Sequence, residues 1–104
     1  MITIVDYGLG NINAIANIYK ELDIPVAIAT DKYSLINASK IILPGVGSFD
    51  SLIAALEKYD LKSSIKEYIL EGKSFLGICV GMQILMNGSE EGSLEGLSIF
   101  DGYV

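Results

Sequence analysis

Residues 74–86 read SFLGICVGMQILM, and this segment sets the kind of fold to expect. Its first part, residues 74–78, is short and apolar, as in a buried β-strand, and residues 80–86 are predicted to form a helix. The pattern G-x-C-x-G joins them through Gly77, Cys79 and Gly81. The same spacing around a serine marks a sharp turn that lifts a nucleophile above the end of a strand, so Cys79 is a candidate reactive residue.

The chemistry of such a turn requires each residue type in it. We expect a positive φ at Cys79, with glycine two residues away on either side because larger side chains would crowd the turn. The N-terminus of the following helix would favour a thiolate, and the backbone N–H of Val80 would face a developing oxyanion. A buried cysteine between two ordinary turn glycines is the alternative, but the position between strand and helix favours the nucleophile.

Strands and helices alternate along the rest of the chain. Apolar or β-branched runs predict strands at residues 2–5, 24–28, 40–43 and 97–100. Apolar positions at helical spacing predict helices at residues 12–22, 33–38 and 50–59, and one that ends at Gly72. Asn11 and Asp50 are the expected N-caps of two of them. This rhythm indicates an α/β fold: an open, mostly parallel sheet with helices on both faces, flavodoxin-like or Rossmann-like.

Composition and charge exclude several classes of function. The chain has 104 residues, enough for one compact domain, and a net charge of −6 without a basic patch. Nucleic acid is therefore not an expected partner. No apolar run approaches the roughly 18 residues that span a membrane, and no signal peptide is recognisable, so we expect a cytoplasmic protein without a membrane partner. The single cysteine excludes an internal disulfide, and no metal or cofactor is expected.

A second glycine turn, Pro44-Gly45-Val46-Gly47-Ser48, follows the strand at 40–43. Glycines on both sides of Val46 allow its peptide planes to turn, which could aim a second N–H at the same oxyanion. A simple strand-to-helix loop would also need glycine, and the turn alone does not separate the two interpretations. Together with residues 8–11 and 77–81 it should lie beyond the carboxyl ends of the strands, where such folds bind ligands.

These turns resemble those of the class I, triad-type glutamine amidotransferases. The resemblance is carried by Gly77-Ile78-Cys79-Val80-Gly81-Met82-Gln83 and Pro44-Gly45-Val46-Gly47. The sequences Asp6-Tyr7-Gly8-Leu9-Gly10-Asn11 and Ser89-Glu90-Glu91-Gly92 narrow it to the branch that serves histidine biosynthesis. It runs from residue 2 to the last residue and covers the N-terminal half of a family domain, so the implied fold is incomplete within residues 1–104.

The resemblance implies a role for each matching residue. Cys79 would attack the side-chain amide of L-glutamine and form a thioester that water later cleaves. The oxyanion hole would be formed by Val80, Val46 and Gly47, and substrate contacts by Gly45, Gln83 and Glu91. Glu91 would receive the substrate ammonium, although it could equally be a solvated loop acid.

The resemblance also implies a partner subunit. Gly8, Gly10 and Asn11 resemble the edge that docks on a (β/α)₈-barrel synthase or cyclase subunit, which consumes the ammonia. The alternative for Asn11 is a plain helix cap.

The sequence departs from the family in lacking histidine. A catalytic triad needs a histidine base and a carboxylate that orients it, and the family supplies both from a His-x-Glu segment beyond the length matched here. Whether that segment was truncated or lies on another chain stays open. We expect no glutaminase activity from the 104 residues alone, because no histidine can protonate the leaving ammonia.

Other functions remain compatible with the sequence. A flavodoxin-like binding module could hold a phosphate at residues 8–11, although the third glycine of G-x-G-x-x-G is replaced by Asn13. A redox or chaperone protein with a cysteine turn would explain Cys79 but not Gln83. An amidotransferase paralogue that supplies ammonia to surface-sugar synthesis fits the same motifs.

Overall fold

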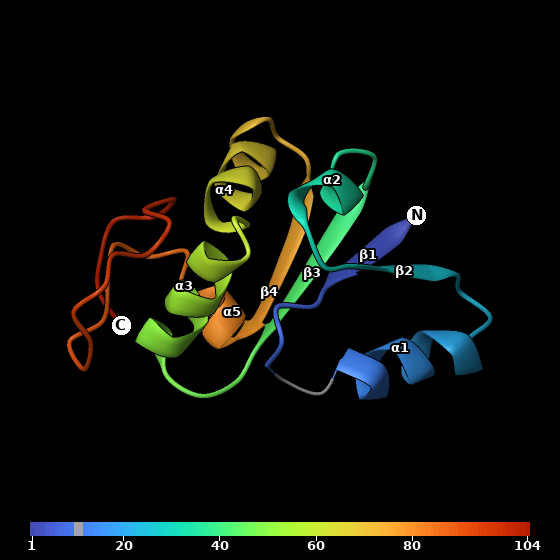
Figure 1. Ribbon diagram of the computed structural model, residues 1–104, viewed down its shortest axis with the longest axis horizontal. Coiled ribbons are helices and arrows are strands. Elements are labelled where there is room, and N and C mark those ends of the chain that lie inside the picture. The colour runs from blue at the N-terminus through green and yellow to red at the C-terminus, as the bar shows by residue number, and fades with distance from the viewer. Residues whose placement is uncertain (10–11) are drawn as a thin grey trace.

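The structure, a computed structural model, describes residues 1–9 and 12–104. Within these residues the strands are β1 (Ile2–Val5), β2 (Val26–Ala29), β3 (Lys40–Gly45) and β4 (Ser74–Cys79). They form one parallel sheet in the order β2-β1-β3-β4 (Figure 1). The helices are α1 (Ile12–Glu21), α2 (Lys32–Leu35), α3 (Phe49–Lys58), α4 (Lys62–Leu70) and α5 (Val80–Gln83).

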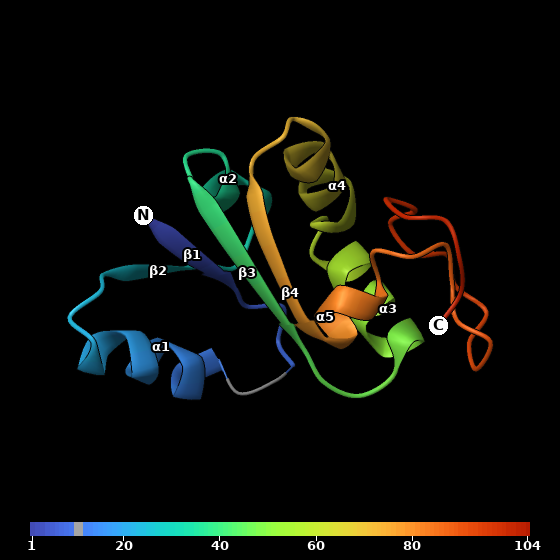
Figure 2. The same cartoon turned by 180° about the vertical axis from the view of Figure 1, so that it is seen from behind.

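Helices cover both faces of this sheet (Figures 1 and 2). Because side chains alternate along a strand, Ile42 of β3 packs with Ile12 of α1, whereas Ile41 and Leu43 join the larger core under α2, α3 and α4. That larger core also contains Tyr7, which extends the line of β1 and is 1% exposed. The expected α/β fold with a parallel sheet and helices on both faces is confirmed.

Element boundaries differ from the sequence-based expectation in several places. β2 begins at Val26 rather than at residue 24, because Pro25 has no N–H to donate to a ladder. α2 begins at Lys32, after Asp31 accepts a hydrogen bond of 2.9 Å from the Ser34 backbone N–H. None of the described helices is both long and apolar enough to cross a membrane.

The strand expected at residues 97–100 does not form, and the helix after Cys79 ends early at Gln83. One interaction explains both differences. The carbonyls of Ile84 and Leu85, which a longer helix would use internally, accept hydrogen bonds from the backbone N–H groups of Leu97 (2.7 Å) and Ile99 (2.8 Å). The segment beyond α5 therefore folds as a loop against the end of this helix rather than as a further strand.

Candidate active site

The parallel register brings two of the glycine turns together at the carboxyl edge of the sheet. Gly45, at the end of β3, pairs with Cys79, at the end of β4. β1 runs parallel to β3, so the turn that begins at Gly8 leaves the sheet at the same edge. The structure thus gives the expected common edge for residues 8–9, 45–48 and 77–81.

Cys79 has the expected positive φ. Its backbone angles are φ 55° and ψ −119°, and its side chain is exposed at the start of α5. These angles match the first central position of a type II′ turn, which is dominated by glycine because a side chain there is strained. α5 is a single turn of four residues, so few peptide dipoles point at the sulfur.

Close backbone packing explains the glycines around Cys79. A Cβ added to Gly77 would lie 2.5 Å from the Gly81 carbonyl oxygen. A Cβ on Gly81 would overlap the Leu43 carbonyl oxygen, and one on Gly45 would overlap the Gly81 nitrogen. The crowding therefore lies partly within the turn, between Gly77 and Gly81, and partly between the turn and the neighbouring strand β3. In both places the atoms are backbone atoms, which cannot move aside as a flexible side chain could.

The Pro44–Gly47 turn has a partner that the sequence analysis missed. The hydroxyl of Tyr7 donates a hydrogen bond to the Pro44 carbonyl oxygen. Burial raises the pKa of Tyr7, the Val46 backbone N–H facing the hydroxyl lowers it, and the charge of Asp6 raises it further; the net shift is upward. Tyr7 therefore fixes the turn at Pro44, two residues before Val46, the residue proposed from sequence as an oxyanion donor.

A cavity of about 620 Å³ adjoins this edge and gathers several of the expected site residues. Gly47, Val80, Gln83 and Glu91 all line it, whereas Cys79 precedes Val80 directly without being part of the lining. Gly45 and Val46 lie in the adjacent turn and do not line it either. The structure therefore brings four of the expected oxyanion and substrate residues around one hollow and leaves Gly45 and Val46 outside its lining.

The loop that carries Glu91 is held by Asp50. The Asp50 carboxylate accepts hydrogen bonds from the backbone N–H groups of Ser93 (2.8 Å) and Leu94 (3.0 Å). These backbone donors, first that of Ser93, lower the pKa of Asp50. Asp50 therefore positions one wall of the cavity, a role that the sequence analysis missed.

The expectation that Asp50 caps α3 is wrong. Ser48 is the N-cap, and its hydroxyl accepts a hydrogen bond of 3.1 Å from the Ser51 backbone N–H. Asp50 lies within the first turn of α3, so its carboxylate is free to reach the distant loop.

The expected partner edge is described only in part. Gly8 has φ 87° and a Cβ there would approach the Tyr59 hydroxyl to 3.3 Å, while Leu9 beside it is 40% exposed. Gly10 and Asn11, including the proposed helix cap, lie outside the described residues. Among the described residues, no three His, Cys, Asp or Glu side chains gather as a metal site.

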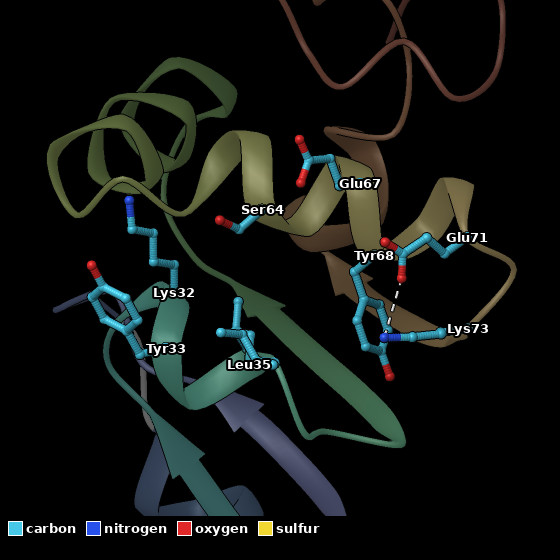
Figure 3. Close-up of a pocket in the computed structure, with 9 residues that line it drawn as sticks. Lys32, Tyr33, Leu35, Ser64, Glu67, Tyr68, Glu71 and Lys73 are labelled. Atoms are coloured by element: carbon cyan, nitrogen blue, oxygen red, sulfur yellow. Dashed lines mark ion pairs between the residues drawn. The ribbon is translucent and has the colours of Figure 1, made fainter.

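A second hollow, of about 320 Å³, lies between α2 and α4 (Figure 3). Its lysines are already paired, since Lys73 contacts Glu71 at 3.2 Å and Lys32 contacts Asp60 at 2.8 Å. Lys73 also directly precedes β4 and so marks the amino end of that strand. Because ligands of parallel α/β folds bind beyond the carboxyl ends, we place the functional site at Cys79 instead.

Comparison with known proteins identifies the class. Residues 3–104 match the family model described as the CobB/CobQ-like glutamine amidotransferase domain, and the chain belongs to this family. A crystal structure described as a glutamine amidotransferase superposes with a TM-score of 0.81 at 18% identity, covering 99% of this chain and 55% of that one. A putative peptidase E from Listeria monocytogenes superposes with a TM-score of 0.64 at 18% identity, covering 83% of this chain and 49% of that one. Both likenesses concern the fold alone.

Curated relatives identify the branch. The chain is 51% identical to imidazole glycerol phosphate synthase subunit HisH of Bdellovibrio bacteriovorus, over 100% of this chain and 52% of the relative. It is 43% identical to the HisH subunit of Leptospira interrogans, over 100% of this chain and 52% of that protein. The chain spans about half the length of the curated relatives it matches. The resemblance to this branch of glutamine amidotransferases is confirmed.

Proposed function

We propose that this chain is the N-terminal half of the glutaminase subunit of an imidazole glycerol phosphate synthase. The observation that carries the proposal is the geometry at Cys79, an exposed thiol held at φ 55° beside Gly45 and next to the cavity. The HisH relatives favour this branch over the surface-sugar paralogues.

The reaction begins when the Cys79 thiolate attacks the side-chain amide carbon of L-glutamine. The carbonyl π electrons move to oxygen, and the N–H of Val80 stabilises this oxyanion together with the turn at Val46 and Gly47. The C–N bond then breaks, the nitrogen takes a proton and leaves as ammonia, and a thioester remains on Cys79. Water hydrolyses the thioester to glutamate and restores the thiol.

The cavity residues orient this substrate. Gln83 and Glu91 line the hollow from α5 and from the loop beyond it. We assign Glu91 to the substrate ammonium and Gln83, with the backbone at Gly45, to further contacts with glutamine. The protons that the reaction needs come from a histidine that a carboxylate orients, and no histidine is among these 104 residues, so the chain alone is expected to be inactive.

Ammonia then passes to a (β/α)₈-barrel synthase subunit that docks at the edge containing Gly8, Gly10 and Asn11. Ammonia released without an acceptor is lost to solvent, so we expect hydrolysis to be slow until the partner and its substrate bind. The turning of the Val46 peptide would provide this control.

The test uses the complete protein together with its synthase partner. Cys79→Ala should abolish synthesis fed with glutamine but leave synthesis fed with free ammonia unchanged, because only the first needs the thiol. Ser74→Ala, at the exposed start of the same strand, serves as the matched control and should leave both reactions intact. Glutamine-dependent turnover by the Cys79→Ala protein would contradict the proposal.

A further inference from the structure

Asp50 links two of the segments that line the cavity beside Cys79. These segments are residues 47–50, at the start of α3, and residues 89–92, which include Glu91. The Asp50 Oδ2 accepts hydrogen bonds from the Ser93 backbone N–H at 2.8 Å and from the Ser93 hydroxyl at 3.3 Å. Its Oδ1 accepts one from the Leu94 backbone N–H at 3.0 Å. One carboxylate therefore joins the start of α3 to the loop that follows Glu91.

The start of α3 gives Asp50 a fixed backbone. The Ser48 hydroxyl caps this helix by accepting a hydrogen bond of 3.1 Å from the Ser51 N–H. In the same turn Phe49 is 5% exposed and Leu52 is 0% exposed, so both are packed in the core. Because a packed core resists displacement, the helix holds the carboxylate in place, and the carboxylate in turn holds the loop.

The contact requires a carboxylate rather than another polar side chain. The N–H groups of Ser93 and Leu94 use different oxygens of Asp50. An asparagine at position 50 would present one oxygen and one NH2 group, and the NH2 group would face a donor. Gly92 also contributes, since a Cβ there would overlap the Asp50 carboxylate. The carboxylate thus packs directly on the backbone that follows Glu91.

The position of Glu91 depends on this backbone. The Glu91 N–H donates to the Ser89 hydroxyl at 3.2 Å, and the Gly92 N–H donates to the Ser89 carbonyl at 3.2 Å, so residues 89–92 form a tight turn. Within residues 1–9 and 12–104, no hydrogen bond or ion pair holds the Glu91 side chain itself. Its place at the cavity is therefore set by the turn, which Asp50 anchors through the residues that follow it.

We propose that Asp50 is a positioning residue that holds the Glu91 turn at the cavity and so determines how tightly the complete enzyme binds L-glutamine. The inference rests on the proposed function, because it concerns the assignment of Glu91 to the substrate ammonium. A carboxylate that is already in place attracts the ammonium without further ordering of the loop. If the loop were loose, part of the binding free energy would be lost in ordering it.

Glutamine binding is measured by isothermal titration calorimetry on the complete subunit with its synthase partner, in a Cys79→Ala background that consumes no substrate. Asp50→Asn should raise Kd about tenfold, which corresponds to about 1.4 kcal/mol. In the protein that keeps Cys79, KM should also rise, while kcat stays within about twofold, because Asp50 acts on binding and not on the reacting atoms. A merely structural role would lower the amount of folded enzyme and hence the apparent kcat. Unchanged KM and Kd in Asp50→Asn would therefore overturn the proposal.

Glu91→Gln separates positioning from a direct contact between Asp50 and the substrate. If Asp50 acts through Glu91, Glu91→Gln alone should also weaken binding, and adding Asp50→Asn should change Kd by less than about twofold. A further loss of about tenfold in the double variant would show that Asp50 acts independently of Glu91, and would overturn the proposal. Unchanged Kd in Glu91→Gln would overturn it as well.

Asp31→Asn is the matched control. The Asp31 carboxylate also accepts hydrogen bonds from a backbone N–H and a hydroxyl, both of Ser34, at 2.9 Å and 2.8 Å, but it lies outside the cavity lining. Its substitution should leave Kd, KM and kcat unchanged, and an equal rise in Kd would overturn the specific role of Asp50. If the wild-type complex failed to hydrolyse glutamine while its binding still depended on Asp50, the proposed function would fall and the role of Asp50 would stand.

Discussion

The strained backbone at Cys79 leads to a reversal of the usual order of stability between alanine and glycine. In an ordinary strand, glycine is less stable than alanine by about 0.5–1 kcal/mol, because it loses more conformational freedom on folding. At φ 55° and ψ −119° a residue with a Cβ carries strain on the order of 1–3 kcal/mol, and glycine does not.

The difference between these two contributions sets the expected magnitude. The Cys79 side chain is exposed, so removal of its sulfur costs little buried surface in either variant. Cys79→Gly should therefore be more stable to unfolding than Cys79→Ala by about 1 kcal/mol, although both lack the nucleophile. Glycine at this position would then be stable but inactive.

Urea unfolding of the complete protein, followed by circular dichroism, measures this difference directly. The control is Ser74, which is exposed at the start of β4. There Ser74→Ala should be more stable than Ser74→Gly by about 0.5–1 kcal/mol, the ordinary order. If alanine were also the more stable residue at position 79, the argument from backbone strain would be refuted.

Two further predictions concern the walls of the site. The N–H groups of Ser93 and Leu94 lower the pKa of Asp50 in the folded protein. This interaction therefore stabilises the folded protein fully at pH values above the ordinary aspartate pKa of about 4. Wild type should therefore have a larger unfolding free energy than Asp50→Asn at pH 7, and this difference should shrink as the pH falls below about 4. A difference that stays constant from pH 7 to pH 3 would contradict this prediction. Gly81→Ala should lower the unfolding free energy by at least ~3 kcal/mol because the Cβ meets backbone, whereas Gly47→Ala, which meets no atoms, should cost about 1 kcal/mol. Equal losses in urea unfolding would refute the steric explanation.

Local signals predicted much of this protein. Short apolar runs with glycine turns between them gave the order of strands and helices, because each strand needs a buried face and each turn needs a special backbone conformation. The spacing of Gly77 and Gly81 around Cys79 predicted the positive φ at the thiol. Tyr7 carried a weaker signal, since it continues the alternation of Thr3 and Val5 onto the core face of β1.

The boundaries of elements were less predictable, because they depend on competing partners. Residues 97–100 have the composition of a strand, yet they pair with carbonyls at the end of α5. Ser48 and Asp50 are both good helix caps, and only the distant loop draws Asp50 away from that role.

The sequence by itself determined which chemistry the carboxyl edge could support: a thiol in a glycine turn, with a second glycine turn after the neighbouring strand. The tertiary structure alone decided how that edge is held. Tyr7 meets Pro44 across 37 residues, and Asp50 meets Ser93 across 43 residues. No local pattern encodes such contacts, because each forms only after the parallel sheet and α3 have set the distance between segments remote in the chain.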